Sequence, residues 1–380
     1  MRRSIALLTL VLAGSRAAAA LPEDPGGLAF DKSTRTETVA GKAVTFDLYV
    51  PQGLGQPAPI VVVGHGFQRK KGNMVDWGQE LARRGYVAAV PDFPGLLPDY
   101  PLNANIVSGL LAWMTTAAPL SGKVDGGRRG VLGYSAGGLA VLMAAASDPT
   151  IDVVVGIDPI DQDGRGVKAA PAVKVPVAFV RGEPGTCNYS GNAADIFAVL
   201  VAPRLSLRVI KATHCDGESP SDSLCALFCG GAHDKARHLS FRRYAFATLD
   251  YFLLCDAAMA PWLGGASAKA DTGITDIVVQ AGFPPTPSCA PAPDAGPPVD
   301  DAGPDVDSAA AADDAATVEA GSSADAAPAQ PDSAPAVDGS SPPDDDGCSC
   351  ALTRPRPAPP LFPSVLLLLL LLSRPKNTRG

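Results

Sequence analysis

Residues 130–139 read Gly-Val-Leu-Gly-Tyr-Ser-Ala-Gly-Gly-Leu, and this stretch decides the predicted fold. An apolar run leads into Ser135, which stands in a Gly-x-Ser-x-Gly motif, and an Ala/Leu/Met-rich helical pattern follows at once. A strand, a sharp turn and a helix in that order hold a serine hydroxyl above a sheet edge. Gly133 and Gly137 leave room for the strand and helix backbones to approach closely. Ser135 is therefore the candidate nucleophile, and an ordinary Gly-rich turn is the alternative.

Strands and helices alternate on both sides of this motif. The β-branched run from Ile60 to Val63 is typical of a strand buried on both faces, whereas residues 36–50 alternate apolar and polar, as in an edge strand. The other expected strands are 86–90, 129–132, 151–157, 175–180 and a last strand at 205–212, and the expected helices are 73–84, 103–117, 136–147 and 240–254. This order predicts an α/β fold with a doubly wound, mostly parallel sheet and no large lid.

Ligands of such sheets bind beyond the carboxyl ends of the strands, so the partners of Ser135 are expected there. A serine hydroxyl needs a base to take its proton, and the base needs a carboxylate to hold its tautomer. His214 follows the last predicted strand directly and is the candidate base. Asp158, which follows the 151–157 strand and precedes Pro159, is the preferred acid. Glu183, at the end of the next strand, is the alternative acid.

Two backbone N–H groups are needed to bind the oxyanion of a tetrahedral intermediate. The candidates are the amide of Ala136, next to the nucleophile, and that of Phe67, in the loop after the 60–63 strand. His65 in the same loop is interpreted as a residue that shapes it. His233 and His238 are interpreted as surface residues.

Apolar residues are expected beside these candidates, in an open cleft that suits esters with a modest acyl or aryl group. The expected lining side chains are Phe67, Phe93, Leu96 and Leu97. The 93–98 loop can equally be a packed turn. Asp161 and Asp163 are interpreted as solvated loop carboxylates.

Four motifs together resemble the α/β-hydrolase superfamily: His65-Gly66-Phe67, Gly133-Tyr134-Ser135-Ala136-Gly137, Gly156-Ile157-Asp158-Pro159 and Thr213-His214. The resemblance covers roughly residues 36–260 and is closest to the chlorophyllase-like, platelet-activating-factor acetylhydrolase-like and polyester-hydrolase-like branches. In the first two branches, the acid follows the strand that comes after the nucleophile and its helix, which implies Asp158. Cutinase-like polyester hydrolases usually place the acid one strand later.

We therefore expect a serine carboxylic-ester hydrolase that works through a Ser-His-Asp triad and an acyl-enzyme, without metal or other cofactor. Its expected partner is a small or lipophilic ester, and it is expected to be a monomer. Cleavage of a polyester, a lipid or an amide by the same triad is one alternative. A catalytically inactive, surface-displayed binding protein on the hydrolase scaffold is the other.

Composition predicts one folded domain, 21–283, with appendages. Residues 1–20 have the basic start, short apolar middle and small-residue end of a signal peptide. Residues 284–347 are expected to be a disordered linker, because Pro, Ala and Asp dominate and positions 284–346 carry 14 acidic residues without Lys or Arg. This linker accounts for most of the net charge of −8, and nothing in the rest of the chain indicates a nucleic-acid partner.

The C-terminal segment 348–380 combines Cys348 and Cys350 with a leucine-rich run that ends at Leu372 and a basic tail. The apolar run has about 12 residues, fewer than the roughly 20 of a membrane-spanning helix. The arrangement resembles the myxobacterial C-terminal sorting domain, which implies that Cys348 or Cys350 is the processing and anchoring site. A permanent short membrane anchor is the alternative. Either way, we expect a secreted protein that is tethered at the cell surface or outer membrane.

Export would place the eight cysteines in an oxidising compartment, where disulfides are the default. Six of them lie in or beside the folded domain: Cys187, Cys215, Cys225, Cys229, Cys255 and Cys289. The sequence does not choose among their pairings. One hypothesis joins Cys255 to Cys289, and another has zinc bound by Cys215, Cys225, Cys229 and His233.

Overall fold

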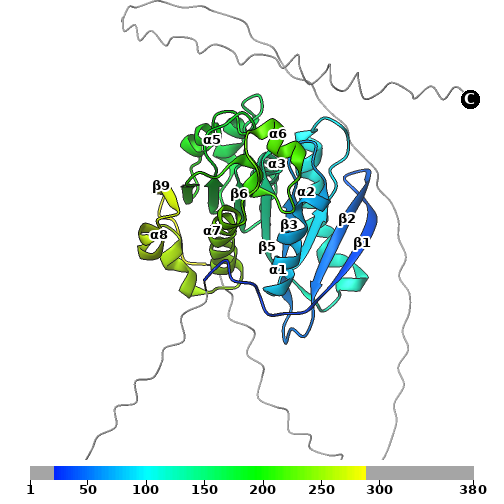
Figure 1. Ribbon diagram of the computed structural model, residues 1–380. Coiled ribbons are helices and arrows are strands. Elements are labelled where there is room, and N and C mark those ends of the chain that lie inside the picture. Colours follow the sequence, from blue (N-terminus) through cyan, green and yellow to red (C-terminus); the bar gives the residue numbers. More distant parts are fainter. Residues whose placement is uncertain (1–20, 288–380) are drawn as a thin grey trace, which may run out of the picture. The chain divides into compact units, whose positions relative to one another are not determined.

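Within residues 21–287, which are the part of the chain that the computed structural model describes, nine strands form one sheet (Figure 1). The order is β1-β2-β4-β3-β5-β6-β7-β8-β9. Strands β4, β3 and β5 to β8 run parallel, and β1, β2 and β9 pair antiparallel to their neighbours. The predicted doubly wound, mostly parallel sheet is thus confirmed. The strands are β1 (Phe30–Val39), β2 (Lys42–Pro51), β3 (Ala58–Gly64), β4 (Val87–Pro91), β5 (Val124–Tyr134), β6 (Val153–Ile157), β7 (Val177–Arg181), β8 (Arg204–Val209) and β9 (Ile274–Gln280).

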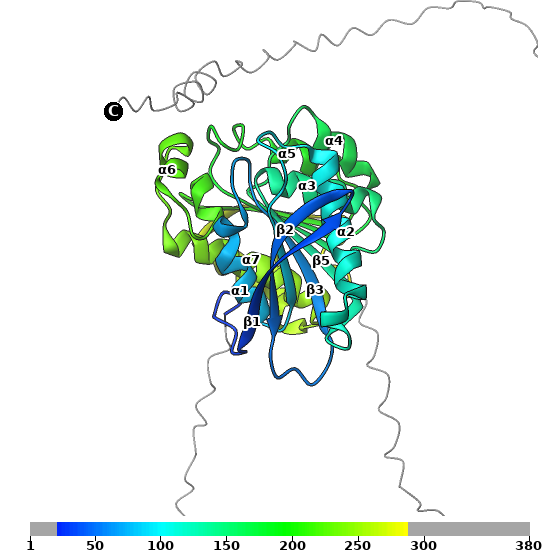
Figure 2. The same cartoon turned by 90° about the vertical axis from the view of Figure 1, so that its right-hand side faces the viewer.

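Helices cover both faces of the sheet (Figure 2). One face carries α1 (Val75–Arg83), α7 (Lys235–Leu253) and α8 (Ala266–Ala270). The other carries α2 (Tyr100–Thr116), α3 (Ala136–Ser147), α4 (Arg165–Ala169) and α5 (Ala193–Val199). The short helix α6 (Ser223–Cys229) lies between β8 and α7 in the chain, and the 3-10 helices are η1 (Lys71–Met74), η2 (Ala118–Leu120), η3 (Ala170–Ala172), η4 (His214–Gly217) and η5 (Ala257–Trp262).

Strand β6 shows why the central strands read as continuous apolar runs. Val153, Val155 and Ile157 pack into the core beneath α1 and α7. Val154 points to the opposite face and packs into the core beneath α2 and α3. Successive side chains of a strand alternate between faces, so a strand covered on both sides must be apolar at every position.

The edges of the sheet differ from the prediction. Residues 36–50 are a hairpin, not one strand, because Ala40 and Gly41 turn the chain with φ of 51° and 71°. The last strand is β9, not β8, and its mostly exposed side chains explain why an apolar pattern did not reveal it. The short helices α4, α5, α6 and α8 were also not predicted, because helices of five to seven residues carry little periodicity.

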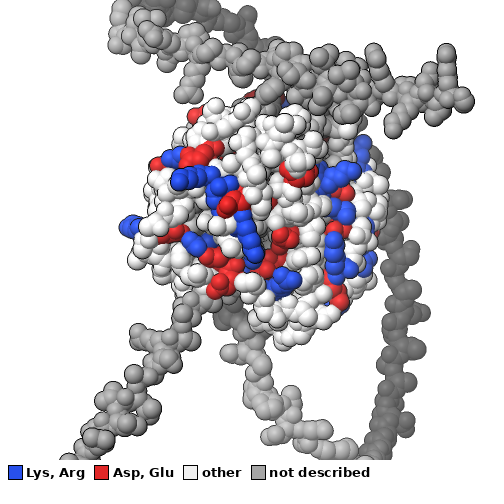
Figure 3. All heavy atoms as spheres, in the orientation of Figure 1, with Lys and Arg blue, Asp and Glu red and all other residues white. Residues whose placement is uncertain are grey.

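Charge is spread over the face that Figure 3 shows without a large field of one sign. On the face that Figure 3 shows, acidic and basic side chains are interspersed, and the upper part around α6 is largely uncharged. The helices of residues 21–287 include none with the length and apolar character that crossing a bilayer requires. The predicted leader, the linker beyond residue 287 and the C-terminal segment with Cys348 and Cys350 lie outside the described residues.

Candidate active site

Ser135 occupies a sharp turn between β5 and α3. Its φ of 54° and ψ of −119° lie in a region that non-glycine residues rarely adopt. Glycines make the turn possible, because a Cβ on Gly133 would lie 2.3 Å from the carbonyl oxygen of Gly137. A Cβ on Gly137 would in turn lie 2.4 Å from the carbonyl oxygen of Gly64 on β3. The turn is therefore wedged between neighbouring backbones that leave no room for a methyl group.

His214 and Asp158 continue from this serine as one hydrogen-bonded chain. The Nε2 atom of His214 lies 2.8 Å from Oγ of Ser135, and its Nδ1 lies 2.6 Å from Oδ2 of Asp158. All three side chains are buried. A carboxylate only accepts, so Nδ1 carries the proton and Nε2 is left to accept from the serine hydroxyl. The structure thus brings together the three candidates from the ends of β5, β6 and β8.

Asp158 is held by more than the histidine. It accepts hydrogen bonds from the amide of Gly182 at 2.9 Å and from Nδ2 of Asn188 at 3.1 and 3.2 Å. Asn188 is buried, and its own oxygen accepts from the amides of Gly185 and Gly191. Sequence reasoning missed Asn188, because a loop asparagine gives no signal of which carboxylate it reaches.

Glu183, the alternative acid, belongs to a different network. Its carboxylate pairs with Arg208 and accepts from the amide of Lys211 at 3.0 Å. Both partners lie on β8 or in the turn after it, and the hydrogen bonds of His214 do not include Glu183. Its side chain is also 36% exposed, whereas that of Asp158 is buried. Glu183 therefore links the end of β7 to β8 and to the turn after it.

The two candidate oxyanion donors flank the serine. Ala136 follows Ser135, and Gly66, just before Phe67, packs so closely that a Cβ there would lie 3.2 Å from the Cβ of Ser135. Within residues 21–287, neither the Phe67 amide nor the Ala136 amide donates a hydrogen bond. Both N–H groups are thus available to a substrate oxygen.

His65 joins this loop to the next one. Its Nδ1 donates to the carbonyl oxygen of Gly66 at 2.8 Å, and its Nε2 accepts from the amide of Phe93 at 2.9 Å. Burial lowers the pKa of His65, which keeps the ring neutral and allows both bonds. The ring is fully used in connecting two backbone segments, as expected for a residue that shapes the loop.

A cavity opens beside the serine, between the Phe67 loop, the 93–98 loop and the start of α2. It is lined by the four expected apolar side chains, Phe67, Phe93, Leu96 and Leu97, by Ala136, and by the polar residues His65, Gln68, Arg69 and Asn103. Leu96 and Leu97 are 87% and 75% exposed, so the 93–98 loop is not a packed turn. The site therefore has an open apolar rim.

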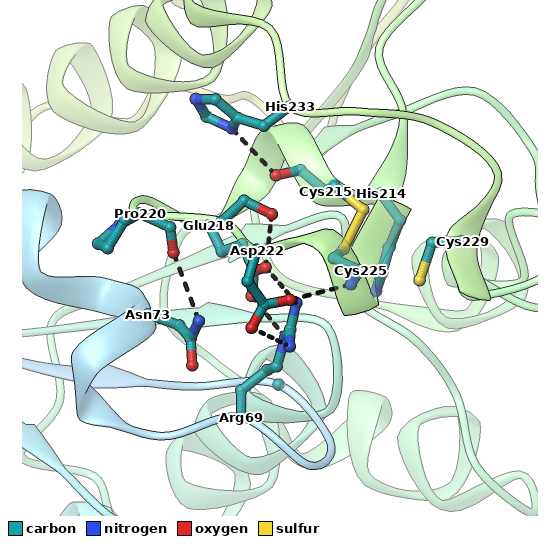
Figure 4. A network of polar contacts seen from close by, with 12 residues as sticks. Arg69, Asn73, His214, Cys215, Glu218, Pro220, Asp222, Cys225, Cys229 and His233 are labelled. Carbon is teal, nitrogen blue, oxygen red and sulfur yellow. Dashed lines mark hydrogen bonds and ion pairs between the residues drawn. A yellow bond between two sulfur atoms is a disulfide. The ribbon is translucent and has the colours of Figure 1, made fainter. Parts of the chain in front are cut away.

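Arg69 connects the Phe67 loop to the histidine loop, as Figure 4 shows. Its guanidinium binds both oxygens of Glu218, with Nε at 2.8 Å from Oε2, and both oxygens of Asp222 at 3.1 Å. Asp222 also caps α6 through the amide of Cys225. Burial raises the pKa of Glu218 although the charge of Arg69 opposes it. The oxyanion loop and the loop that carries His214 are thus joined by one forked ion pair.

Tyr134, the residue before the nucleophile, also contacts the histidine loop. Its hydroxyl donates to the carbonyl oxygen of His214 at 3.0 Å, and its ring lies 4.9 Å from the imidazole. The contact fixes the backbone of His214 from below the site.

Two disulfides attach α6 to the loop that carries the base and to the loop that carries Asn188. Cys225 is bonded to Cys215, the neighbour of His214, and Cys229 is bonded to Cys187, the neighbour of Asn188. The sulfurs of Cys215, Cys225 and Cys229 are close together, but none of them is a free thiolate, so the zinc hypothesis is wrong for this structure. Cys255 is disulfide-bonded as well, and Cys289 lies outside the described residues.

Two interpretations of polar residues were wrong. His238 is buried, donates from Nδ1 to the carbonyl oxygen of Asp216 at 2.9 Å and packs against Trp77, and burial lowers its pKa to about 4. Asp161 is also buried, because its carboxylate accepts from the amides of Gly166 and Val167 at the start of α4. Asp163 is exposed, as expected.

Comparison with known proteins adds an independent observation. Residues 17–199 match the model of a family described as PET hydrolase-like. Over 137 residues the chain is 29% identical to a bis(hydroxyethyl) terephthalate hydrolase of Streptomyces coelicolor, which is 36% of this chain and 43% of that relative. The chain thus spans less than half the length of the curated relative that it matches. The family match includes Ser135 and Asp158 and ends before His214. By its fold and by these matches, the chain is similar to ester hydrolases of the α/β-hydrolase type.

Proposed function

We propose that this protein is a serine hydrolase that cleaves carboxylic esters through an acyl-enzyme. The single observation that carries the proposal is the continuous hydrogen-bonded chain from Ser135 through His214 to Asp158. Beside it lie two backbone N–H groups without a partner in residues 21–287 and an open apolar cavity. The similarity to enzymes whose names specify ester substrates supports the same reaction.

The chemistry follows from the geometry. Oγ of Ser135 attacks the ester carbonyl carbon while Nε2 of His214 takes the hydroxyl proton. Asp158 stabilises the imidazolium, and the amides of Phe67 and Ala136 bind the oxyanion, each worth roughly 3 kcal/mol of barrier. The C–O bond to the alcohol then breaks, and His214 returns the proton to the leaving oxygen. Water, deprotonated by His214, attacks the acyl-enzyme in the same way and releases the acid and the free serine.

The substrate class follows from the cleft. Exposed Leu96, Leu97 and Phe67 beside the serine favour an ester with an aliphatic or aromatic group over a charged one. The names of the matched family and relative, which specify terephthalate esters, support an aromatic acid part. We therefore propose uncharged aliphatic or aromatic esters as substrates, with polyester fragments among them.

The test is hydrolysis of p-nitrophenyl acetate and butyrate by the full chain, produced by export so that its disulfides form. Ser135→Ala should lower kcat by roughly 10³-fold or more. Ser147→Ala, an exposed serine at the end of the same helix, is the matched control and should leave kcat unchanged. A fluorophosphonate should label the peptide that contains Ser135. Equal rates for wild type and Ser135→Ala would favour the inactive binding protein instead.

We also propose that the enzyme is exported and tethered through its C-terminal segment. The basic and apolar start of the chain, the Cys348 and Cys350 pair with its leucine run, and the disulfides of the folded part support this location. Fractionation of producing cells should find the wild type in the envelope. A variant with Cys348→Ala and Cys350→Ala should be released to the medium, and retention of this variant would favour a permanent membrane anchor.

A further inference from the structure

Asn103 stands out among the residues that line the cavity beside Ser135. It lies in the first turn of α2 and lines the cavity together with Phe67 and Ala136. Its side chain is only 4% exposed, and its Oδ1 has no hydrogen-bond partner among residues 21–287. No hydrogen bond of its Nδ2 to another described residue is formed either. Among the described residues, the amide of Asn103 is thus left without a hydrogen-bond partner in the lining of this cavity.

Such an arrangement is unusual, because buried polar groups are almost always paired. Asn188, the other buried asparagine of the site, shows the ordinary case. Its oxygen accepts from two backbone amides, and its nitrogen donates to Asp158 and to the carbonyl oxygen of Glu183. An amide left unpaired at a cavity costs stability that apolar residues of the same shape would not cost. Asn103 is therefore better explained by a ligand that enters the cavity than by the fold.

We propose that Asn103 determines specificity by hydrogen-bonding a hydroxyl group carried by the ester substrate close to its scissile carbonyl. The inference rests on the proposed ester hydrolysis and narrows its substrate class to hydroxyl-bearing esters. Asn103 touches the substrate but takes no part in proton transfer.

A hydroxyl fits the amide better than other substrate groups do. The buried Oδ1 accepts only, so it needs a donor, which an ester or ether oxygen does not offer. A hydroxyl donates to Oδ1 and can accept from Nδ2, so it satisfies the amide in either orientation of its oxygen and nitrogen. A cationic donor would enter a pocket that Arg69 also lines, where the like charge of the guanidinium disfavours it. The cavity volume of about 50 Å³ has room for a substituent of a few atoms.

Two positions on the substrate offer the same chemistry, and two matched ester pairs distinguish them. The pair 2-hydroxyethyl benzoate and propyl benzoate replaces a hydroxyl by a methyl in the alcohol part. The pair p-nitrophenyl 3-hydroxybutyrate and p-nitrophenyl 3-methylbutyrate makes the same replacement in the acyl part. The full chain with its disulfides is assayed for kcat/KM on all four esters.

The expected result is a preference of the wild type for the hydroxyl member of one pair, by about 3- to 10-fold in kcat/KM. Asn103→Leu should remove this preference by slowing only the hydroxyl member. Asn105→Leu is the matched control, because it makes the same change at an exposed position of the same helix, and it should alter neither pair. The pair in which the preference appears identifies the alcohol or the acyl part.

The melting temperature of Asn103→Leu is a second measurement. If Asn103 had only a structural role, this substitution would lower the Tm. Because the amide has no partner within residues 21–287, Asn103→Leu should leave the Tm unchanged or raise it. A fall in Tm with equal slowing of both pair members would overturn the inference, as would a preference that survives the substitution. If Asn103→Leu does not fold, Asn103→Ala is assayed instead, and the ratio of kcat/KM between the hydroxyl and methyl members of each pair decides in the same way. Hydrolysis of the methyl members shows that the ester hydrolase proposal stands whatever the ratio, and a wild type that cleaves none of the four esters contradicts both proposals.

Discussion

The two halves of the site are held in place by different forces. The serine half consists of β3 with its loop, β5 and α3, and its parts meet through backbone contacts at Gly64, Gly133 and Gly137. The histidine half consists of the segments after β6, β7 and β8 together with α6. It is held by Asn188 and by two disulfides, and the ion pair of Arg69 joins it to the serine half.

Because the forces differ, different kinds of substitution should damage the two halves. Close backbone packing excludes added atoms but does not depend on charge or redox state. Side-chain hydrogen bonds, ion pairs and disulfides tolerate looser packing, but each depends on particular functional groups. Four sets of substitutions, three of them with a matched control, test this contrast.

The largest effect is expected at the ends of β6 and β7. Asp158→Asn keeps the shape of the side chain but no longer holds the tautomer of His214, so kcat should fall by roughly 10³- to 10⁴-fold. Glu183→Gln is the matched control. It makes the same change at a carboxylate that pairs with Arg208, whereas the carboxylate of Asp158 pairs with His214. It should change kcat by less than about twofold, because substitutions away from the site usually have small effects. Steady-state kinetics on p-nitrophenyl butyrate distinguish the two, and comparable losses would remove the distinction between the two strand ends.

The disulfides should dominate the stability of the histidine half. Replacing Cys187 and Cys229 together by serine opens a link across 42 residues and should lower the unfolding free energy by about 4 kcal/mol. Replacing Cys215 and Cys225 opens a link across 10 residues and should cost about 3 kcal/mol. Urea unfolding monitored by tryptophan fluorescence measures both. Unchanged midpoints in both variants would mean that hydrogen bonds alone hold this half.

An added methyl group should damage the serine half. In Gly137→Ala the new Cβ would lie 2.4 Å from the carbonyl oxygen of Gly64, so overpacking should cost about 1–3 kcal/mol of unfolding free energy. Gly72→Ala is the control, because a Cβ there meets nothing within 4 Å. It should leave the urea midpoint unchanged or raise it slightly. If Gly137→Ala were as stable as Gly72→Ala, the turn at Ser135 would be able to move and accommodate the added methyl group.

Arg69 tests whether the two halves are coupled. Arg69→Ala removes the forked contacts to Glu218 and Asp222, so the oxyanion loop should shift relative to His214 and kcat should fall roughly tenfold with little change in KM. Arg69→Lys should recover only part of the loss, since an ammonium cannot form the fork.

Arg243→Ala is the matched control for Arg69. Arg243 also binds two carboxylates, those of Glu23 and Asp271, and contacts no residue of the site. Its loss should lower the Tm and leave kcat unchanged. If the two alanine variants lose the same kcat at matched stability, Arg69 serves the fold and not the alignment of the two loops.

Some features of the fold were readable from the sequence because they are local. The β-branched run at 60–63, the Gly-x-Ser-x-Gly turn and the helix at 136–147 each follow from neighbouring residues, and α3 begins and ends as predicted. Strand β9 and the hairpin turn at Ala40 were missed, because a mostly exposed edge strand and a two-residue turn alter the apolar pattern very little. The same limit applies to His238 and Asp161, whose burial depends on Trp77 and on the start of α4.

By itself, the chain determined the order of its strands and helices, the sharp turn at Ser135 and a short set of polar residues at strand ends. Apolar periodicity and backbone sterics act over a few residues, so they leave a direct trace in the sequence. The folded arrangement was needed to show that His214 meets Asp158 and not Glu183, that Cys187 pairs with Cys229, and that Asn103 lines the cavity with no partner for its Oδ1 within residues 21–287. Hydrogen bonds and disulfides select partners by distance in space, and the distances between loops far apart in the chain arise only when the sheet has formed.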